Sequence, residues 1–191
     1  MKMKIPAQYL AAAAEFQASK DARHYLVGVC LRQKSDHIEV CATNGHILLK
    51  IDHDSAEELT QREVIVRFTP DQLRELRKKG NRDKVVELHL GKLNPLDSNM
   101  MINGIVSPLE IVDGKFPDYD KIIPENPEHN GKTPAFNANY WQSFAKAAVF
   151  LTRDTVDPAV QVRYSDETSA ARVEFPLSEV SAVGVIMPVR V

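Results

Sequence analysis

The chain has 191 residues, of which 43% are hydrophobic and 26% charged, so it can bury a sizeable core in one or two compact domains and is not a disordered protein. The formal net charge of -2 argues against a protein that coats nucleic acid through a general basic excess. No apolar run approaches the roughly 20 residues that a bilayer span needs, and residues 1–6 lack the apolar core of an export signal. We therefore expect a cytoplasmic protein with no membrane contact.

The first third of the chain predicts one helix followed by three strands. Residues 7–18 are alanine-rich and helical by propensity, Pro6 suits the helix start, and Lys4-Ile5 is a candidate short strand in front. Strand-like runs follow at 24–32, 37–43 and 46–52. The last two meet at Asn44-Gly45, a pair that favours positive φ at both positions. This stretch predicts either an ordinary hairpin or one wall of a surface groove.

Two cysteines, Cys30 and Cys41, are too few for a disulfide framework and have no metal-ligand spacing. Counting outward from a turn at Ser35-Asp36 places them opposite each other across a hairpin, so a cross-strand disulfide is geometrically conceivable. Because there is no export signal, two reduced and buried thiols are the expectation.

The order of elements recurs in the middle of the chain. Residues 64–68 predict a strand, and Thr69-Pro70 predicts a capped start for a helix over 71–79 that ends at Gly80. Three further strands are expected, at residues 84–90, 100–106 and 107–112.

A third copy of this order closes the chain. Residues 114–132 are rich in Pro, Asn, Asp and Gly and predict a linker. Residues 135–137 then predict a short strand and residues 138–151 a helix. The final strands are expected at 160–164, 171–175 and 181–189.

The predicted fold class is therefore α+β, with three βαβββ modules of roughly 64 residues (191 divided by 3). Residues 1–123 are expected to form one domain of two modules (1–63 and 64–113) followed by the linker, and residues 124–191 a single half-domain. A helix that crosses an antiparallel sheet leaves sheet edges bare, so neighbouring modules are the expected cover.

Four motifs resemble the bacterial β sliding clamp family, the processivity subunit of DNA polymerase III. They are His-Tyr-Leu-Val-Gly at 24–28, Ala-Thr-Asn-Gly-His-Ile-Leu at 42–48, Gly-Lys-Phe-Pro-Asp-Tyr-Asp-Lys-Ile-Ile-Pro at 114–124 and Val-Ile-Met-Pro-Val-Arg-Val at 185–191. The resemblance implies repeated βαβββ modules closed into a ring around duplex DNA. Family members usually have three domains, and this chain resembles a shortened member with the middle domain and the last half-domain.

The resemblance also implies a hydrophobic groove for short peptides of a DNA polymerase or a clamp loader. An apolar slot with a few donors at its rim suits a Leu or Phe anchor. For Met187 and Val189 the alternative is ordinary core packing. The implied groove residues are Leu26, Thr43, Gly45, His46, Ile47, Leu48, Pro124, Val185, Met187, Pro188, Val189 and Arg190.

Three groove positions depart from the family pattern. Ile47 stands where arginine is common, Asn44 where aspartate is common, and Val189 where methionine is often found. The first two put the polar part of the groove in doubt, and the smaller valine implies a shallower pocket.

The family's helices line the inner wall of the ring, so basic residues near the helices are the DNA-binding candidates. Arg74, Arg77 and Lys78 stand at i, i+3 and i+4 and would form one stripe. The alternative is a solvated helix face. A sequence-independent contact suits mobile Lys and Arg side chains. The candidates are Lys20, Arg23, Arg74, Arg77, Lys78, Lys79, Arg82 and Lys146.

No catalytic, metal or cofactor motif is visible in the sequence. His53, His89 and His129 have no partner at ligand spacing, and there is neither a Gly-rich phosphate loop nor a nucleophile elbow. His46 is better explained by the groove than as a catalytic base. The chain is therefore expected not to be an enzyme and to need no cofactor or metal.

The resemblance predicts a DNA sliding clamp that tethers its partners. Because the family ring has twelve modules and this chain three, a ring of that size takes four copies (12 divided by 3), a homotetramer. An odd module count requires an isologous two-fold contact between chains. The alternative is a clamp-derived interaction module that competes for clamp partners, or adapts them, without encircling DNA.

Overall fold

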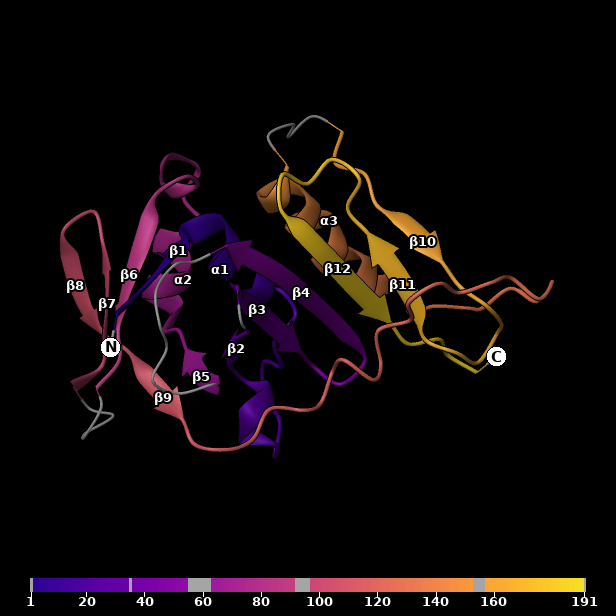
Figure 1. Ribbon diagram of the computed structural model, residues 1–191, viewed down its shortest axis with the longest axis horizontal. Coiled ribbons are helices and arrows are strands. Elements are labelled where there is room, and N and C mark those ends of the chain that lie inside the picture. The colour runs from indigo at the N-terminus through magenta and orange to yellow at the C-terminus, as the bar shows by residue number, and fades with distance from the viewer. Residues whose placement is uncertain (1, 35, 55–62, 92–96, 153–156, 191) are drawn as a thin grey trace.

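The computed structural model describes residues 2–34, 36–54, 63–91, 97–152 and 157–190. Figure 1 shows three units in chain order, each a helix against strands. The first unit holds β1 (Lys2–Pro6), α1 (Ala7–Ala14), a 3-10 helix at His24–Leu26, β2 (Val29–Gln33), β3 (His37–Thr43) and β4 (Ile47–Asp54). The second holds β5 (Glu63–Arg67), α2 (Pro70–Leu76), a 3-10 helix at Lys79–Asn81, β6 (Val85–His89), β7 (Asn99–Ile102), β8 (Ile105–Pro108) and β9 (Glu110–Val112).

The third unit lacks a full first strand. It holds a 3-10 helix at Ala138–Tyr140, α3 (Trp141–Leu151), β10 (Gln161–Arg163), β11 (Ala171–Glu174) and β12 (Ser181–Ile186). Where a strand at 135–137 was expected, Ala135 forms one isolated bridge to Val189, and Asn137 caps the 3-10 helix instead. The α+β fold class is confirmed, with the βαβββ order present in the first two units and without its first strand in the third.

The first two modules exchange their first strands. β1 pairs with β6 of the second module, and β5 pairs with β2 of the first. The result is a four-stranded sheet in the order β1-β6-β7-β8 and an eight-stranded sheet in the order β10-β11-β12-β4-β3-β2-β5-β9. Modules 1–63 and 64–113 are therefore interlocked, while the division into domains at residue 123 stays a prediction.

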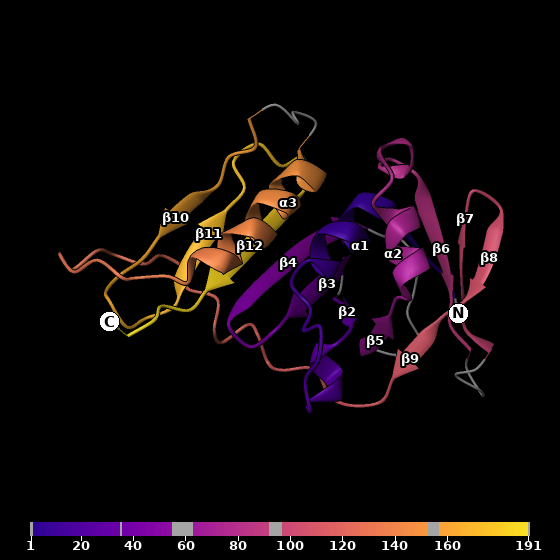
Figure 2. The same ribbon diagram turned by 180° about the vertical axis from the view of Figure 1, so that it is seen from behind.

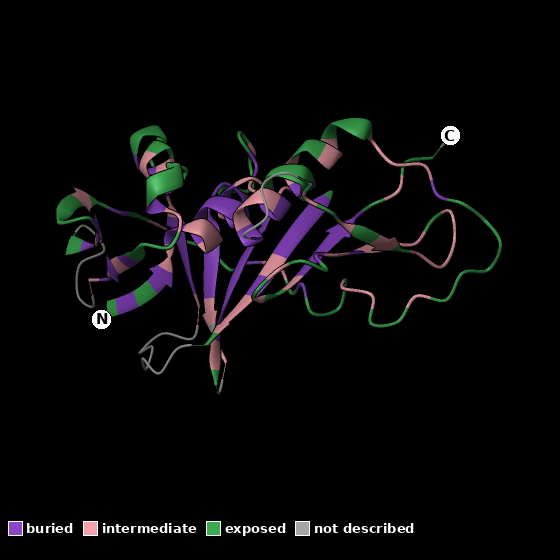
Figure 3. Cartoon of the chain, turned by 90° about the horizontal axis from the view of Figure 1, so that it is seen from above, coloured by how far each residue is buried: buried purple, intermediate pink, exposed green. Residues whose placement is uncertain are grey.

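The centre of the eight-stranded sheet is buried on both faces, which explains why β3 is almost continuously apolar. Val40, Leu49 and Val66 belong to the main core with α1 and α3, whereas their neighbours Cys41 and Ile65 belong to a cluster on the opposite face. Figure 2 shows α1, α2 and α3 side by side on one side of the sheets. Figure 3 shows exposed residues on the outer sides of α2 and α3, whereas the residues of α1 are buried or intermediate.

Both amino-terminal helices end earlier than expected. α1 stops at Ala14 and not at residue 18, because Glu15 and Phe16 bond three residues back, which tightens the last turn. α2 begins at the predicted Thr69 cap, where Gln72 completes a capping box. It ends at Leu76 and not at residue 79, because the Asn81 amide caps the carbonyl oxygen of Glu75 at 2.9 Å.

Two strand predictions are wrong in a way that local geometry explains. His24–Leu26 is a 3-10 helix, so the run expected at 24–32 is a strand only from Val29. The strand expected at 100–106 is broken by Asn103 and Gly104, whose φ angles of 53° and 76° form a two-residue turn between β7 and β8.

The cysteine prediction is confirmed in the described residues. Cys30 and Cys41 face each other in the β2–β3 ladder, and both are free and buried. Burial raises the pKa of both thiols, so neither is poised to react.

Candidate functional site

Residues 114–123 of the predicted linker lie against the sheet face that points away from the helices. Phe116 and Tyr119 are buried there with Leu48, Cys41 and Val185. Their rings meet edge to face with centroids 6.0 Å apart. This segment, called the strap below, therefore packs against strands of both the first and the third unit.

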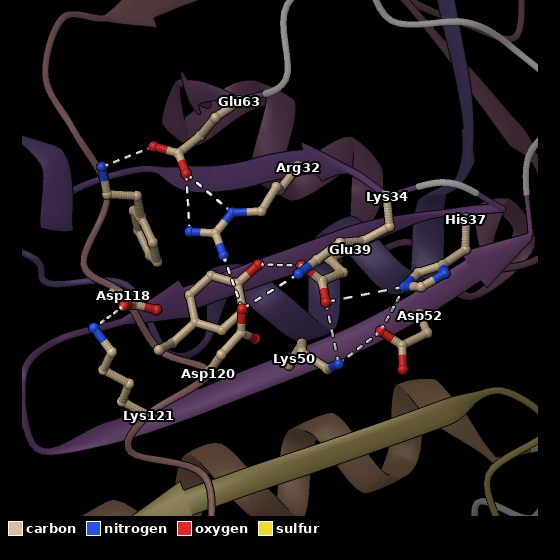
Figure 4. Close-up of polar contacts among 12 residues, drawn as sticks. Arg32, Lys34, His37, Glu39, Lys50, Asp52, Glu63, Asp118, Asp120 and Lys121 are labelled. Carbon is tan, nitrogen blue, oxygen red and sulfur yellow. Dashed lines mark hydrogen bonds and ion pairs between the residues drawn. The ribbon is translucent and has the colours of Figure 1, made fainter.

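A buried carboxylate holds the strap in place (Figure 4). Glu39 is 2% exposed and accepts a hydrogen bond from the Tyr119 hydroxyl at 2.6 Å. The Lys50 ammonium lies 3.2 Å from Glu39, and the Arg32 guanidinium lies over the Tyr119 ring, 4.2 Å from its centroid. Burial, with the charge of Glu39, raises the pKa of Tyr119, so its hydroxyl stays a donor at neutral pH.

The acidic cluster around Glu39 is neutralised by a lysine side chain of the same chain. His37, Glu39 and Asp52 bring three ligand atoms close enough for a metal ion. The Lys50 ammonium, however, lies 3.2 Å from Glu39 and 3.1 Å from Asp52, so it neutralises the two carboxylates. The donor set does not fit a metal as long as Lys50 stays there.

The turn before β4 is built by side chains, not by two positive φ angles. Only Gly45 is left-handed, at φ 90°, while the Asn44 side chain accepts hydrogen bonds from the amides of His46 and Ile47. Thr43 accepts from the Gly45 amide and donates to the Ile47 carbonyl. Asn44 therefore does what an aspartate would do here, since either carboxamide or carboxylate oxygen can accept these bonds.

The carboxy-terminal segment meets this turn directly. Ile186 pairs with Ile47 in the β4–β12 ladder, and the Met187 amide donates to the His46 carbonyl at 2.9 Å. His46 stacks on Tyr140 with ring centroids 5.7 Å apart. The Val189 amide then donates to the Ala135 carbonyl, which fixes the direction of the tail.

The twelve implied groove residues divide by exposure. Five are buried, namely Leu26, Thr43, Ile47, Leu48 and Val185. The other seven, Gly45, His46, Pro124, Met187, Pro188, Val189 and Arg190, are partly or fully exposed. Met187 and Val189 are each 38% exposed, which argues against the core-packing alternative for both. The accessible surface here, called the tail rim, is formed by these two residues and His46.

Not every implied residue lies at the tail rim. Leu26 packs in a separate small cluster with Ala18 and Val27, and Tyr25 contacts both that cluster and the one around Leu48. Arg172 donates a hydrogen bond to the Pro124 carbonyl at 3.1 Å. Pro124 also lines a neighbouring cavity of about 240 Å³.

Four of the DNA-binding candidates gather on the helix side of the molecule. A cavity of about 260 Å³ between α2 and α3 has an apolar floor and a cationic rim. It is lined by Leu76, Arg77, Lys78, Lys79, Arg82, Val149 and Phe150. The predicted basic stripe and the third module thus meet at one surface.

Two cations of this rim, Arg77 and Lys78, and two further candidates, Arg74 and Lys146, are held by ion pairs within the chain. Glu15 on α1 accepts from Arg77 at 2.7 Å and from Lys146 at 3.0 Å. Arg74 pairs with Asp71 at 2.6 Å, and Lys78 pairs with Glu75. The Arg74 and Lys78 pairs are exposed and weak, so these side chains can leave them for phosphate. The Glu15 side chain is only 9% exposed and holds Arg77 and Lys146 more firmly.

Arg82, Lys20 and Arg23 are placed differently. Arg82 donates to the Phe150 and Thr152 carbonyls at the end of α3 and so has a structural task. Lys20 lines a separate cavity with Asp21 and Phe68. Arg23 pairs with Asp21 at 2.8 Å, which lowers the pKa of that carboxyl to about 2, and it lies beside Gly45 near the predicted groove.

The sequence analysis missed Glu15, Glu39, Tyr140 and Arg172. Glu39 could have been found, because it is the one carboxylate inside the otherwise apolar strand at 37–43. Glu15 and Arg172 act through partners that are distant in the sequence, and no local pattern marks them.

No protein-family model matches the chain. Curated relatives include the β sliding clamps of Proteus mirabilis, 29% identical over 135 residues, and of Escherichia coli K12, 28% identical over 142 residues. The matches cover 69% of this chain and 35% and 34% of those proteins, so the chain spans about a third of the length of the curated relatives it matches.

Solved structures share the fold along the whole chain. A sliding clamp of Pseudomonas aeruginosa superposes with a TM-score of 0.74 at 18% identity. The polymerase III β of Caulobacter crescentus gives 0.71 at 17%, and the polymerase III β subunit of Thermotoga maritima gives 0.69 at 12%. Each match covers 100% of this chain and 66% of the other. In sequence over 69% of its length and in fold throughout, the chain is thus similar to the bacterial β sliding clamps, the family that its four motifs predict.

Proposed function

We propose that the protein is a DNA sliding clamp, a cytoplasmic ring of four copies that encircles duplex DNA and tethers a polymerase or a clamp loader. The observation that carries the proposal is the β4–β12 ladder, which continues one sheet across two modules. All three helices lie on the same side of the sheets (Figure 2). Similar strand pairing between the sheet edges of neighbouring copies would extend a row of modules into a ring with the helices inside.

The inner wall of such a ring would be the helix side. The rim of Arg77, Lys78 and Lys79 with Arg74 and Lys146 would contact phosphates without reading bases. Their acidic partners Glu15, Asp71 and Glu75 would keep each contact weak, which suits a ring that slides.

Partner tethering would use the tail rim, which lies at the carboxy-terminal end of β12. Met187 and Val189 offer apolar surface, and His46 offers a polar edge for a short peptide with a Leu or Phe anchor. The proposed activity is mechanical confinement, so it requires neither a catalytic residue nor a cofactor.

The decisive experiment compares nicked circular DNA with the same DNA after linearisation. A closed ring is retained on the circle and lost from the linear molecule by sliding off an end. The mass in solution, measured by light scattering, should correspond to four copies. A monomer, or binding that survives linearisation unchanged, would exclude the ring.

Charge reversal tests the inner wall. Arg74, Arg77 and Lys78 changed to Glu should lower retention on circles about tenfold or more and leave the mass unchanged. The matched control reverses Lys115, Lys121 and Lys132, which are exposed residues of the strap and the linker. Equal losses for both triple variants would show that only net charge matters.

Removal of residues 187–191 tests the tail rim. The truncated chain should lose binding of a polymerase-derived hydrophobic peptide and keep both its mass and its retention on circles. If peptide binding survives, the tether lies elsewhere.

A second candidate function is an interaction module that occupies clamp partners without encircling DNA. It is favoured by the outer edge of β8, which has no strand partner among the described residues. In that case the mass would be below four copies, and peptide binding would persist without retention on DNA.

A further inference from the structure

β8 occupies the same position in its module as β4. Each is the third strand after the helix of its unit and follows an Asn-Gly pair, Asn44-Gly45 before β4 and Asn103-Gly104 before β8. The outer edge of β4 is covered by β12, with residues 47–52 opposite residues 181–186. In the described residues β8 pairs with β7 alone, so its other edge has no strand partner, and the Gln72 side chain donates to the Pro108 carbonyl at 2.7 Å at one end of it.

The side chains of β8 do not protect that edge. Ile105 and Val106 are each 61% exposed, and the strand Ile-Val-Ser-Pro carries no charge. The other three edge strands do carry charges, Lys2 and Lys4 on β1, Glu110 on β9 and Arg163 on β10. Since charges on edge strands prevent unwanted pairing, β8 is the described edge that is suited to accept another strand.

The hydrogen-bonding groups of Val106 point outward. In a two-residue hairpin the residues that flank the turn, here Ile102 and Ile105, form a hydrogen-bonded pair. The next pair, Met101 and Val106, is then not hydrogen-bonded, so the Val106 N–H and C=O face away from β7. Pro108 has the same orientation but has no N–H to donate.

These groups select one partner and one register. Two β8 strands in antiparallel contact, with Val106 opposite Val106, exchange two hydrogen bonds on a two-fold axis. If the strands slipped so that Val106 faced Pro108, each pair would lose one bond, because proline cannot donate. A strand with these properties is therefore complementary to a second copy of itself.

We propose that β8 joins two copies of this chain across a two-fold axis at Val106. The junction rests on the proposed ring, of which it would be one of the contacts between chains. It would extend the sheet β1-β6-β7-β8 into its copy, as β4 and β12 extend the other sheet within the chain. Ile105 and Val106 would be buried by the contact.

The first test measures the mass of Val106→Lys by light scattering. The mass should fall by half, from four copies to two, because the introduced ammonium group would face the same positive charge of the second copy across the two-fold axis. Val85→Lys is the matched control, since Val85 is 52% exposed on β6 of the same sheet but not on its edge, and it should keep four copies. An unchanged mass for Val106→Lys would overturn the junction.

The second test does not depend on how well the charged variant folds. Under mild oxidation Val106→Cys should form a disulfide-linked dimer, whereas Val85→Cys should not, and the buried Cys30 and Cys41 should not contribute. Absence of the dimer in a four-copy protein that is retained on circular DNA would overturn the junction and leave the clamp function standing. A wild-type monomer would overturn both.

Discussion

Glu39 shows how one buried charge can organise separate segments of the chain. Lys50 from β4 and Tyr119 from the strap both bond to this carboxylate, and Arg32 from β2 covers the Tyr119 ring (Figure 4). A buried carboxylate is tolerated only when it is paired and hydrogen-bonded, so the strap and the sheet depend on each other.

Removal of the Tyr119 hydroxyl should therefore destabilise the protein. Tyr119→Phe leaves a Glu39 oxygen buried without its donor, and we expect a loss of about 1–3 kcal/mol in the free energy of unfolding. Urea titration of Tyr119→Phe against Tyr164→Phe, a half-buried tyrosine outside the strap, measures it. The control should stay within about 0.5 kcal/mol of the wild type.

The same tyrosine predicts a response to alkaline pH. Because the pKa of Tyr119 is raised in the folded state above its ordinary value of 10.0, its contribution is fully present below pH 10 and is lost as the pH rises further. The free energy of unfolding should therefore fall more steeply above pH 10 in the wild type than in Tyr119→Phe. Parallel curves would contradict the raised pKa.

The two Asn-Gly pairs show what single residues can and cannot predict. The φ values expected at residues 44 and 45 occur instead at 103 and 104, where a continuous strand was expected. The sequence of each pair is the same, but at the first pair the neighbouring Thr43 hydroxyl offers the backbone other hydrogen bonds. An Asn-Gly pair indicates where the chain changes direction, and the residues next to the pair decide the backbone conformation of the turn.

At the scale of elements, α3 and β12 approach so closely that only glycine fits between them. A Cβ at Gly184 would lie 2.5 Å from Phe144 Cε1 and 3.3 Å from Val173 Cβ. Phe144 in turn meets Phe16 of α1 edge to face, with ring centroids 4.9 Å apart. The contact therefore links the third module to the first.

We expect Gly184→Ala to destabilise the protein by about 1–3 kcal/mol, because the added methyl group must displace Phe144. Gly80→Ala is the control, since nothing lies within 4 Å of a Cβ there, and it should stay within about 0.5 kcal/mol of the wild type. Thermal unfolding followed by circular dichroism distinguishes the two. Equal effects would show that backbone entropy, not packing, governs both positions.

The sequence predicted most elements because their patterns are local. The capped start of α2, the helix α3 and the Cys30–Cys41 register all follow from residues within a few positions of one another. The exchange of β1 and β5 between modules could not be predicted, because strand periodicity does not say which strand is the partner. The tail rim required the family resemblance.

At the scale of the whole molecule, the weak helix-side cations predict two different responses to salt. With about four phosphate contacts, affinity for linear DNA should fall about 10²-fold between 50 and 200 mM salt. A closed ring on nicked circular DNA should remain through the same range, because topology and not affinity holds it. Gel filtration of loaded circles measures retention, and release from circles and linear DNA at the same salt concentration would contradict encirclement.

Strand exchange also sets an order of events during synthesis. Lys2 pairs with His89 and Ile5 with Val86, so β1 waits for a strand that the ribosome makes more than eighty residues later. Until then the apolar underside of α1 has no complete sheet to rest on and is a natural substrate for chaperones on the nascent chain. Slow translation between these two segments would therefore lengthen the period in which the emerging protein is most exposed to aggregation.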